Sequence, residues 1–408
     1  MPHRPAAHDA GMKAKQALTP LQLVLFTFTR TVANTSYRMV YPFLSTFQNG
    51  LGLSLGSISL LLTLRSLTGL IGPLAAPLAD WRGRKLVMLL GVGVFSAGAL
   101  LVTLWPSITT FFISVLLMTL SYLVFLPSMQ AYIGDRVPYH QRGRAMGLTE
   151  LSWSLAFIFG VPFVGWLLGR TGAWQSPFPL FAGLGLVMLA VLAFFIPADR
   201  AAHSASPAAL NRGGLRQVLR TPAVPIGLGM AMAMTAANES VNLVFGLWLE
   251  GSFGLKLAAL GAASAVLGIA ELGGEGLSAG LVDRLGKEWS IRAGLLLNSV
   301  AAVALIFSGG AVWSALAALF LFYLSFEFTI VSALPLMSEA LPALRATVMA
   351  SMVASFSIGR ALAAVLGPFL FTTWSFPANA IAAVVFNLAA IALLSRLKIV
   401  PHATESEA

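Results

Sequence analysis

The stretch ANTSYRMVY at residues 33–41 returns as ANESVNLVF at residues 237–245. Four of the nine positions are identical, and the two copies lie 204 residues apart in a chain of 408 residues. Each copy places polar side chains inside a long apolar segment. A partly polar stretch that repeats after half the chain predicts two related halves, each of which contributes to one shared site.

The composition indicates that lipid surrounds most of the chain. Apolar residues make up 58% of the sequence, charged residues only 10%, and the mean hydropathy is +0.85, unlike a soluble domain. Crossing a hydrocarbon core of about 30 Å takes roughly 20 helical residues, and the apolar segments lack the alternation of barrel strands. We predict an all-α membrane protein with twelve transmembrane helices. The predicted spans are 20–44, 56–79, 86–105, 108–133, 145–168, 178–196, 223–249, 257–280, 290–309, 312–338, 346–370 and 377–396.

The basic residues predict the orientation of these helices. Lysine and arginine accumulate in the short cytoplasmic loops of membrane proteins. With both termini in the cytoplasm, 19 of the 25 basic residues lie on the cytoplasmic side, and only Arg170 and Lys256 lie on the other side. The net charge of +10 then reflects topology, so no nucleic-acid partner is expected. We predict a multi-pass protein of a bacterial-type inner membrane.

Several catalytic chemistries have no residues to support them. The chain has no cysteine, and its five histidines lie in predicted tails or loops. A buried Ser-His-Asp triad and a thiolate or histidine metal site are therefore not expected within the membrane. The phosphate-binding pattern G-x-x-x-x-G-K-[ST] is also missing from the sequence. We expect neither an enzyme nor a bound cofactor.

The repeat extends well beyond the opening stretch. LADWRGRK follows the second predicted helix and LVDRLGKE follows the eighth. The predicted halves are 20–196 and 223–396, with cytoplasmic tails at 1–19 and 397–408 and a polar, basic cytoplasmic linker at 197–222. Within this linker, LNRGGLRQVLR is compatible with a short amphipathic helix at the membrane surface. Two such halves predict a binding site between them near the middle of the membrane.

The loop APLADWRGRK resembles the signature between helices 2 and 3 of major facilitator superfamily (MFS) transporters, and its degenerate copy follows helix 8. The pattern departs from that signature at Ala76 and Trp81. The resemblance implies twelve helices in two pseudo-symmetric halves and a latch that joins the halves on the cytoplasmic side. The alternative is that these residues only satisfy the positive-inside rule and tighten a turn. The predicted latch residues are Asp80, Gly83, Arg84, Asp135, Asp283, Gly286, Lys287 and Glu339.

Charges inside the predicted helices are the main guide to function, because each costs about 2.5–3.5 kcal/mol at the centre of a membrane helix. One interpretation is that they form ion pairs that only hold the bundle together; the other is that they bind and couple ligands, which we favour. In the first copy of the repeat, the polar residues share one face of a continuous predicted helix. The predicted substrate-binding residues are Arg30, Asn34, Tyr37, Arg38, Tyr41, Arg65, Asn238, Asn242 and Phe245.

A carboxylate at membrane depth can couple transport to protons. Desolvation favours its protonated form and a nearby arginine favours its ionised form, so a change of neighbour loads or releases a proton. Glu239 and Glu327 are the preferred proton carriers, with Arg360 as a candidate partner of Glu327. For Glu150 and Glu275 the structural and functional interpretations stay open. The predicted proton-coupling residues are Glu239, Glu271, Glu327 and Arg360.

The direction of transport depends on a weaker pattern. FIFGVPFVGW in the fifth predicted helix resembles the Gly- and Pro-rich signature of the drug and proton antiporters of this superfamily, although close helix packing explains its glycines equally well. We predict a monomeric secondary transporter that exports a small organic solute in exchange for protons. An importer of an organic anion or sugar, and a membrane sensor that transports nothing, are the alternatives.

Overall fold

The computed structural model describes residues 18–71, 82–197 and 212–398, and every helix or strand assigned within these ranges is a helix. The predicted all-α class is therefore confirmed. Helix covers some part of each of the twelve predicted spans. The division into tails, halves and linker stays a prediction, because residues 1–17, 198–211 and 399–408 lie outside the described ranges.

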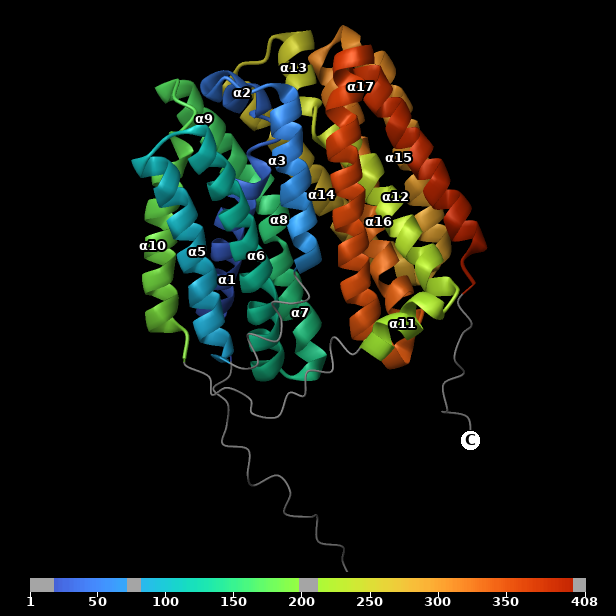
Figure 1. Cartoon of the computed structure of the whole chain (residues 1–408). Coiled ribbons are helices and arrows are strands. Elements are labelled where there is room, and N and C mark those ends of the chain that lie inside the picture. The colour runs from blue at the N-terminus through green and yellow to red at the C-terminus, as the bar shows by residue number, and fades with distance from the viewer. Residues whose placement is uncertain (1–17, 72–81, 198–211, 399–408) are drawn as a thin grey trace, which may run out of the picture.

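The helices before residue 198 form one group, blue to green in Figure 1. Helix α1 begins with a reciprocal cap, because Thr19 accepts a hydrogen bond from the Gln22 amide and the Gln22 side chain accepts one from the Thr19 amide. The elements are α1 (Pro20–Arg38), α2 (Leu44–Leu51), α3 (Leu55–Leu67), the 3₁₀ turn η1 (Thr68–Ile71), α5 (Arg84–Leu104), α6 (Ile108–Arg136), α7 (Tyr139–Glu150), α8 (Ser152–Leu155), the π-turn η2 (Ala156–Gly160), α9 (Val161–Thr171) and α10 (Pro177–Phe195).

The helices after residue 211 form the second group, yellow-green to red in Figure 1. The predicted short helix of the linker is present as α11, which packs through buried Val218 against α12 and α17. The elements are α11 (Arg212–Arg220), α12 (Ala223–Asn242), α13 (Phe245–Phe253), α14 (Leu257–Leu285), α15 (Lys287–Phe307), the 3₁₀ turns η4 (Ser308–Gly310) and η5 (Pro342–Leu344), α16 (Val312–Glu339) and α17 (Arg345–Arg396).

The repeated stretch breaks its helix at the same point in both copies. Helix α1 ends at Arg38 and α12 ends at Asn242. Each is followed by a short helix, α2 or α13. Both short helices end at a glycine in the left-handed conformation, Gly52 or Gly254, with φ +64°. The prediction of one continuous helical face through Tyr41 is therefore wrong. In the first copy, Pro42 explains the break, since proline lacks an amide hydrogen and disfavours helix at the residue before it.

The predicted number of twelve spans is not confirmed. Eight single helices in the described ranges are long and apolar enough to cross a membrane, and a ninth span is added if α2 and α3–η1, bent by 118°, count together. One reason is that α17 joins the predicted spans 346–370 and 377–396 through a turn at Ser375. Another is that polar residues of the repeat, such as Asn238 and Glu239, lower the hydropathy of α12.

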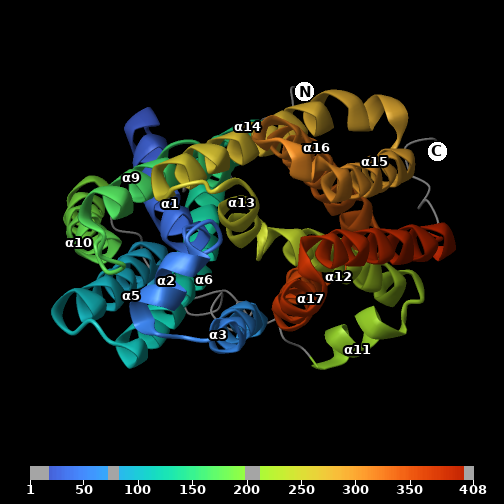
Figure 2. The same cartoon turned by 90° about the horizontal axis from the view of Figure 1, so that it is seen from above.

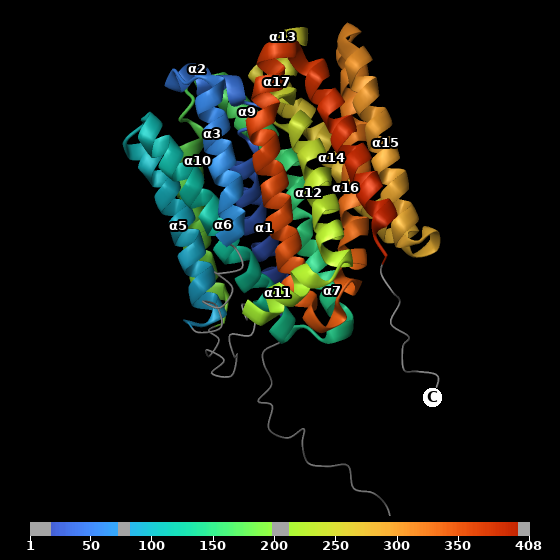
Figure 3. The ribbon, with the colours of Figure 1, turned by 45° about the vertical axis from the view of Figure 1, so that its right-hand side comes forward.

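The two groups lie side by side as bundles of helices. Seen from above, α3 lies beside α17 and α9 lies beside α14 (Figure 2), and both pairs are in contact. Helices α2 and α13 lie at one end of the molecule, and α7 and α11 lie at the other (Figure 3). The outer surface carries large apolar side chains such as Phe194, Phe307 and Trp313, each more than 80% exposed. Such a surface suits lipid rather than water.

Candidate functional site

The two halves touch closely at the α2/α13 end. The Ser45 hydroxyl of α2 donates a hydrogen bond to the carboxylate of Glu250 in α13. Gly246 lies against the backbone that follows α1, where an added Cβ would be 2.6 Å from Pro42 Cα. Only glycine allows this approach, because any side chain would collide with backbone. The space between the halves is therefore closed at this end.

The helix pairs α3/α17 and α9/α14 continue the contact along the bundle. The Ser59 hydroxyl donates to the carbonyl oxygen of Ala364 across the first pair at 2.5 Å. In the second pair, an added Cβ at Gly165 would lie 2.7 Å from the Leu257 carbonyl oxygen, and one at Gly261 would lie 3.0 Å from Pro162 Cα. Close packing thus accounts for Gly165 of the predicted helix-5 signature.

A cavity of about 330 Å³ lies between the halves, toward the α7/α11 end. Its lining comes from α1, α3, η1, α6, α7 and α8 of the first group and from α14, α16 and α17 of the second. Of the predicted substrate-binding residues, Arg30, Asn34, Tyr37 and Arg65 line it. Of the predicted coupling residues, Glu327 and Arg360 line it.

The first-half arginines of this cavity have different partners. Arg30 forms a two-pronged ion pair with Glu150, with nitrogen–oxygen distances of 2.9 and 2.8 Å. Arg65 instead donates to the backbone oxygen of Tyr37 at 2.9 Å and to the hydroxyl of Tyr41 at 2.7 Å, and its guanidinium lies 3.9 Å from the centre of the Tyr37 ring. Arg30 is neutralised within its own half, whereas no described carboxylate pairs with Arg65.

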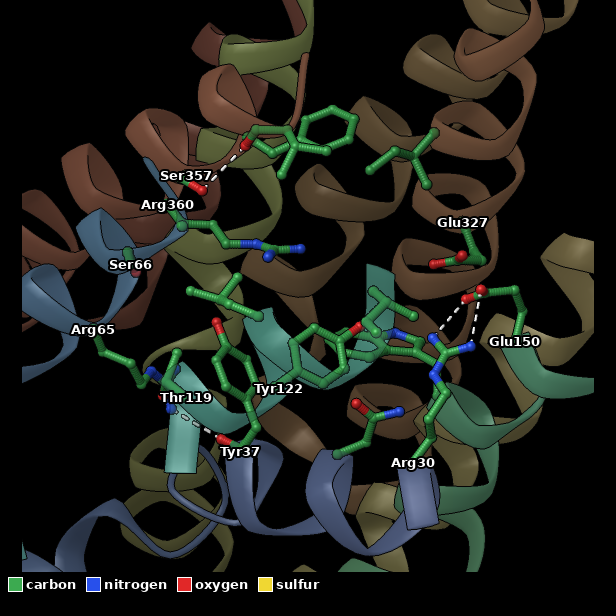
Figure 4. Close-up of a pocket in the computed structure, with 18 of the residues that line it drawn as sticks. Arg30, Tyr37, Arg65, Ser66, Thr119, Tyr122, Glu150, Glu327, Ser357 and Arg360 are labelled. Atoms are coloured by element: carbon green, nitrogen blue, oxygen red, sulfur yellow. Dashed lines mark hydrogen bonds and ion pairs between the residues drawn. The ribbon is translucent and has the colours of Figure 1, made fainter. Parts of the chain in front are cut away.

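The second-half charges of this cavity face each other without contact. Neither Glu327 nor Arg360 makes a hydrogen bond or ion pair with any residue in the described ranges, so the suggested Glu327–Arg360 pair is not formed in this conformation. Figure 4 shows Arg360 and Arg65 on one side of the cavity and Glu327 and Glu150 on the opposite side. The separation leaves room for a ligand between opposite charges.

A second, much smaller cavity of about 20 Å³ has its lining tied together across the halves. Arg38 at the end of α1 and Glu271 in α14 form a two-pronged ion pair at 2.7 and 2.6 Å, and both side chains are 3% exposed. The Arg38 guanidinium also lies 3.3 Å from the centre of the Phe157 ring. Such a buried, two-pronged pair fixes both partners in orientation.

A chain of hydrogen bonds crosses the halves beside this ion pair. The Tyr41 hydroxyl accepts from Arg65 and donates to the carboxylate of Glu239 at 2.8 Å. Asn242 donates to the other oxygen of Glu239 at 3.1 Å and accepts from the Tyr323 hydroxyl at 2.6 Å. The two copies of the repeated stretch therefore meet directly, through Tyr41 of the first and Glu239 of the second.

The remaining predicted ligand residues lie around this chain. Asn238 lines the small cavity, and its buried side-chain nitrogen has no hydrogen-bond partner among the described residues. Phe245 lines neither cavity and packs edge-on against Tyr323, with ring centres 6.4 Å apart. A role for Phe245 in contacting a ligand has no support in this conformation.

Four of the described latch residues pair within their own half. Arg84 lies 2.6 Å from the carboxylate of Asp135, and Lys287 pairs with Glu339. Gly83 and Gly286 precede α5 and α15 at φ +88° and +86°, a conformation that favours glycine. Asp283 is exposed, and Asp80 lies outside the described residues. A latch between the halves stays a prediction.

Several cavity residues were missed or left open by the sequence analysis. Tyr122 and Trp153 line the large cavity, as do Phe326 and Ser357. Phe326 and Ser357 lie 204 residues after Tyr122 and Trp153, which is also the spacing of the repeated stretch. Applying that spacing to every aromatic residue would have paired Tyr122 with Phe326, whereas Trp153 falls on Ser357 and would not have been singled out. Glu150 and Glu275, which were left open, also line the cavity.

Comparison with known proteins agrees with this architecture. The sequence profile of the Major Facilitator Superfamily matches residues 26–362 and 228–408. The chain belongs to this superfamily. It is 28% identical over 359 residues to the Uncharacterized MFS-type transporter YwfA of Bacillus subtilis (strain 168), which covers 87% of this chain and 86% of that protein. Multidrug resistance protein 2 of the same organism is 25% identical over 287 residues, covering 68% and 71%.

A solved structure shares the fold of this MFS protein. It is the inward-facing, unoccupied crystal structure of a bacterial homolog to the human lysosomal transporter Spinster, with a TM-score of 0.71 and 16% identity, covering 92% of this chain and 94% of that one. Among the described residues, no group of three His, Cys, Asp or Glu side chains is placed to hold a metal ion.

Proposed function

We propose that this MFS transporter exports a small organic solute in exchange for protons, by alternating access between two states of the interface between its halves. The observation that carries the proposal is the pair of buried contacts that cross the halves, Arg38–Glu271 and Tyr41–Glu239. Each contact includes a carboxylate, and protonation of that carboxylate would weaken it. A proton can therefore weaken the contacts between the halves, which must break and re-form during transport.

The conformation described here is open toward the cytoplasm in this proposal. The large cavity lies toward the α7/α11 end, while Ser45, Glu250 and Gly246 close the opposite end. The loops at the α7/α11 end carry most of the basic residues, which favours that end as cytoplasmic. The cavity would then receive solute from the cytoplasm.

An exchanger must not change between its inward-open and outward-open states when it carries neither a proton nor a solute. The buried contacts between the halves supply this property. With Glu239 and Glu271 ionised, the ion pair and the hydrogen-bonded chain hold the α2/α13 end closed. A proton on either carboxylate removes a charge that these donors require. Proton loading would thus free the halves to move, so protons and solute would cross in separate steps.

Efflux is supported by likeness rather than by geometry. The chain is 25% identical to a protein named Multidrug resistance protein 2, and resistance to drugs is consistent with their export. The apolar and aromatic lining of the cavity, with Tyr122, Trp153 and Phe356, suits an amphiphilic solute. Both observations favour export of an organic compound over uptake of a sugar.

The test is solute-driven proton movement in proteoliposomes that contain a pH-sensitive dye. A solute gradient moves protons against the solute in an exchanger and with it in a symporter, so the sign of the signal distinguishes them whichever way the protein is inserted. Lipophilic cations, organic anions, zwitterions and sugars form the panel.

We expect proton movement opposite to one class of solute, and its loss in Glu239→Gln. Glu288→Gln is the matched control, because Glu288 is an exposed acid in the first turn of α15. Solute flux without proton movement would leave a uniporter, and proton movement in the same direction as the solute would replace exchange by symport.

A further inference from the structure

The large cavity has two walls of opposite charge. The positive wall is formed by α3 and α17, which lie side by side and contribute Arg65 and Arg360. The negative wall is formed by α14 and α16, which are also neighbours and contribute Glu275 and Glu327. Arg30 and Glu150 also line the cavity, but they neutralise each other. The remaining charges therefore leave the cavity polarised from one wall to the other.

No described carboxylate pairs with the positive wall. Arg65 is 1% exposed, and its two hydrogen bonds go to neutral oxygens of Tyr37 and Tyr41. Arg360 has no hydrogen bond or ion pair with a described residue, and its guanidinium points into the cavity in Figure 4. Guanidinium groups present planar sets of donors that suit a carboxylate or a phosphate.

No described cation pairs with the negative wall. Glu327 is 9% exposed and accepts no hydrogen bond from the described residues, and Glu275 has only a long contact of 3.5 Å from the Ser154 hydroxyl. A buried carboxylate without a partner is costly. A ligand that brings an ammonium group to this wall would supply the missing charge.

The space between the walls is lined mainly by aromatic and aliphatic side chains. Tyr37, Tyr122 and Trp153 contribute from the first half, and Phe326 and Phe356 contribute from the second. Aromatic and apolar linings recognise the body of a ligand, while a few polar groups fix its orientation. The lining therefore matches an apolar or aromatic body between two charged ends.

We propose that the solute of this transporter is a zwitterion with an aromatic or apolar body, its anionic group bound by Arg360 and Arg65 and its cationic group bound by Glu327 and Glu275. The proposal rests on the transport function above and names the chemical class of the solute. A ligand with one charge would neutralise one wall and leave the charges of the other without a partner. With Glu327 and Glu275 ionised, only a ligand that carries both charges satisfies both walls.

The test measures binding to the full-length protein in detergent at pH 7 by calorimetry, with three probes of one shape. 4-(Aminomethyl)phenylacetate carries both charges, 4-methylphenylacetate carries only the anionic one, and 4-methylbenzylamine carries only the cationic one. We expect the zwitterion to bind at least about tenfold more tightly than either analogue, the difference expected for a charge-assisted contact.

Two substitutions separate the walls. Arg360→Gln should lower the affinity for the zwitterion to that for 4-methylbenzylamine and leave the affinity for 4-methylbenzylamine unchanged. Glu327→Gln should lower the affinity for the zwitterion to that for 4-methylphenylacetate. Arg170→Gln is the control, because Arg170 is an exposed basic residue at the end of α9. A general loss of folding would weaken all probes together rather than change their ratio.

Equal affinity for the zwitterion and a single-charge analogue in the unsubstituted protein would overturn the proposal, and so would no binding of any probe at millimolar concentration. These outcomes use no substituted protein, so a variant that fails to fold cannot obscure them. Transport of lipophilic cations in exchange for protons, together with no preference for the zwitterion, would remove this inference and leave the proposed exchange function intact.

Discussion

The two polar regions between the halves differ in how their charges are satisfied. Around the small cavity, Arg38 is paired with Glu271, and Glu239 receives hydrogen bonds from Tyr41 and Asn242. In the large cavity, Glu327 and Arg360 face each other with no described partner. Both regions lie between the same two bundles. The two regions thus share their position between the halves, and pairing is what distinguishes them.

This difference separates two roles for buried charge. Charges that are paired across the halves hold one conformation, because breaking such a pair leaves a charge without compensation in a medium that solvates it poorly. Charges that face a cavity without a partner destabilise the empty site and favour a ligand that supplies the missing charge. The small network would then govern movement, and the large cavity would govern recognition.

The largest expected effect comes from breaking the Arg38–Glu271 pair. Arg38→Gln should lower the free energy of unfolding by about 3–5 kcal/mol, because Glu271 is left buried and uncompensated. Adding Glu271→Gln should recover most of the loss, since both charges are then gone. The measurement is chemical unfolding in detergent of both single variants and the double variant. Additive losses in the double variant would show that the two residues do not act as a pair.

A smaller effect is expected from Tyr41→Phe, which removes one hydroxyl from the hydrogen-bonded chain. The loss should be about 1–3 kcal/mol, because Glu239 loses a donor and Arg65 loses an acceptor. The change should also favour opening at the α2/α13 end, since the bond crosses the halves.

Spin labels can measure that opening directly. The chain has no cysteine, so labels at Asn49→Cys on α2 and Ser252→Cys on α13, both exposed, report only the distance across this end. A longer distance population in Tyr41→Phe is expected. An unchanged distance distribution would show that the bond contributes to stability alone. Ser54→Ala, which removes the cap of α3 without touching the other half, is the control.

The sequence predicted the bundle, the repeat and the identity of the buried charges, because lipid makes every buried charge conspicuous. It did not predict their partners. Arg38 and Arg360 look alike in sequence, yet Arg38 is paired and Arg360 makes no ion pair with a described residue, since pairing depends on how the halves are placed in one conformation. The turn at Ser375, which joins two predicted spans into α17, was also not predicted. The 204-residue spacing also contained information about the cavity that the predictions did not use, since it relates Tyr122 to Phe326.

The smallest effect on stability is expected from Arg360→Gln. It makes the same chemical change as Arg38→Gln, but at an arginine of the large cavity that has no described partner. Arg360 has no described partner to leave uncompensated, so the free energy of unfolding should change by less than about 1 kcal/mol and can rise, because an unpaired charge is removed from a partly buried position. Solute transport should nevertheless fall. The measurement is unfolding in detergent beside Arg38→Gln under identical conditions. If both substitutions cost the same, pairing does not distinguish the two regions, and Arg360 has a structural role that its lack of described contacts does not reveal.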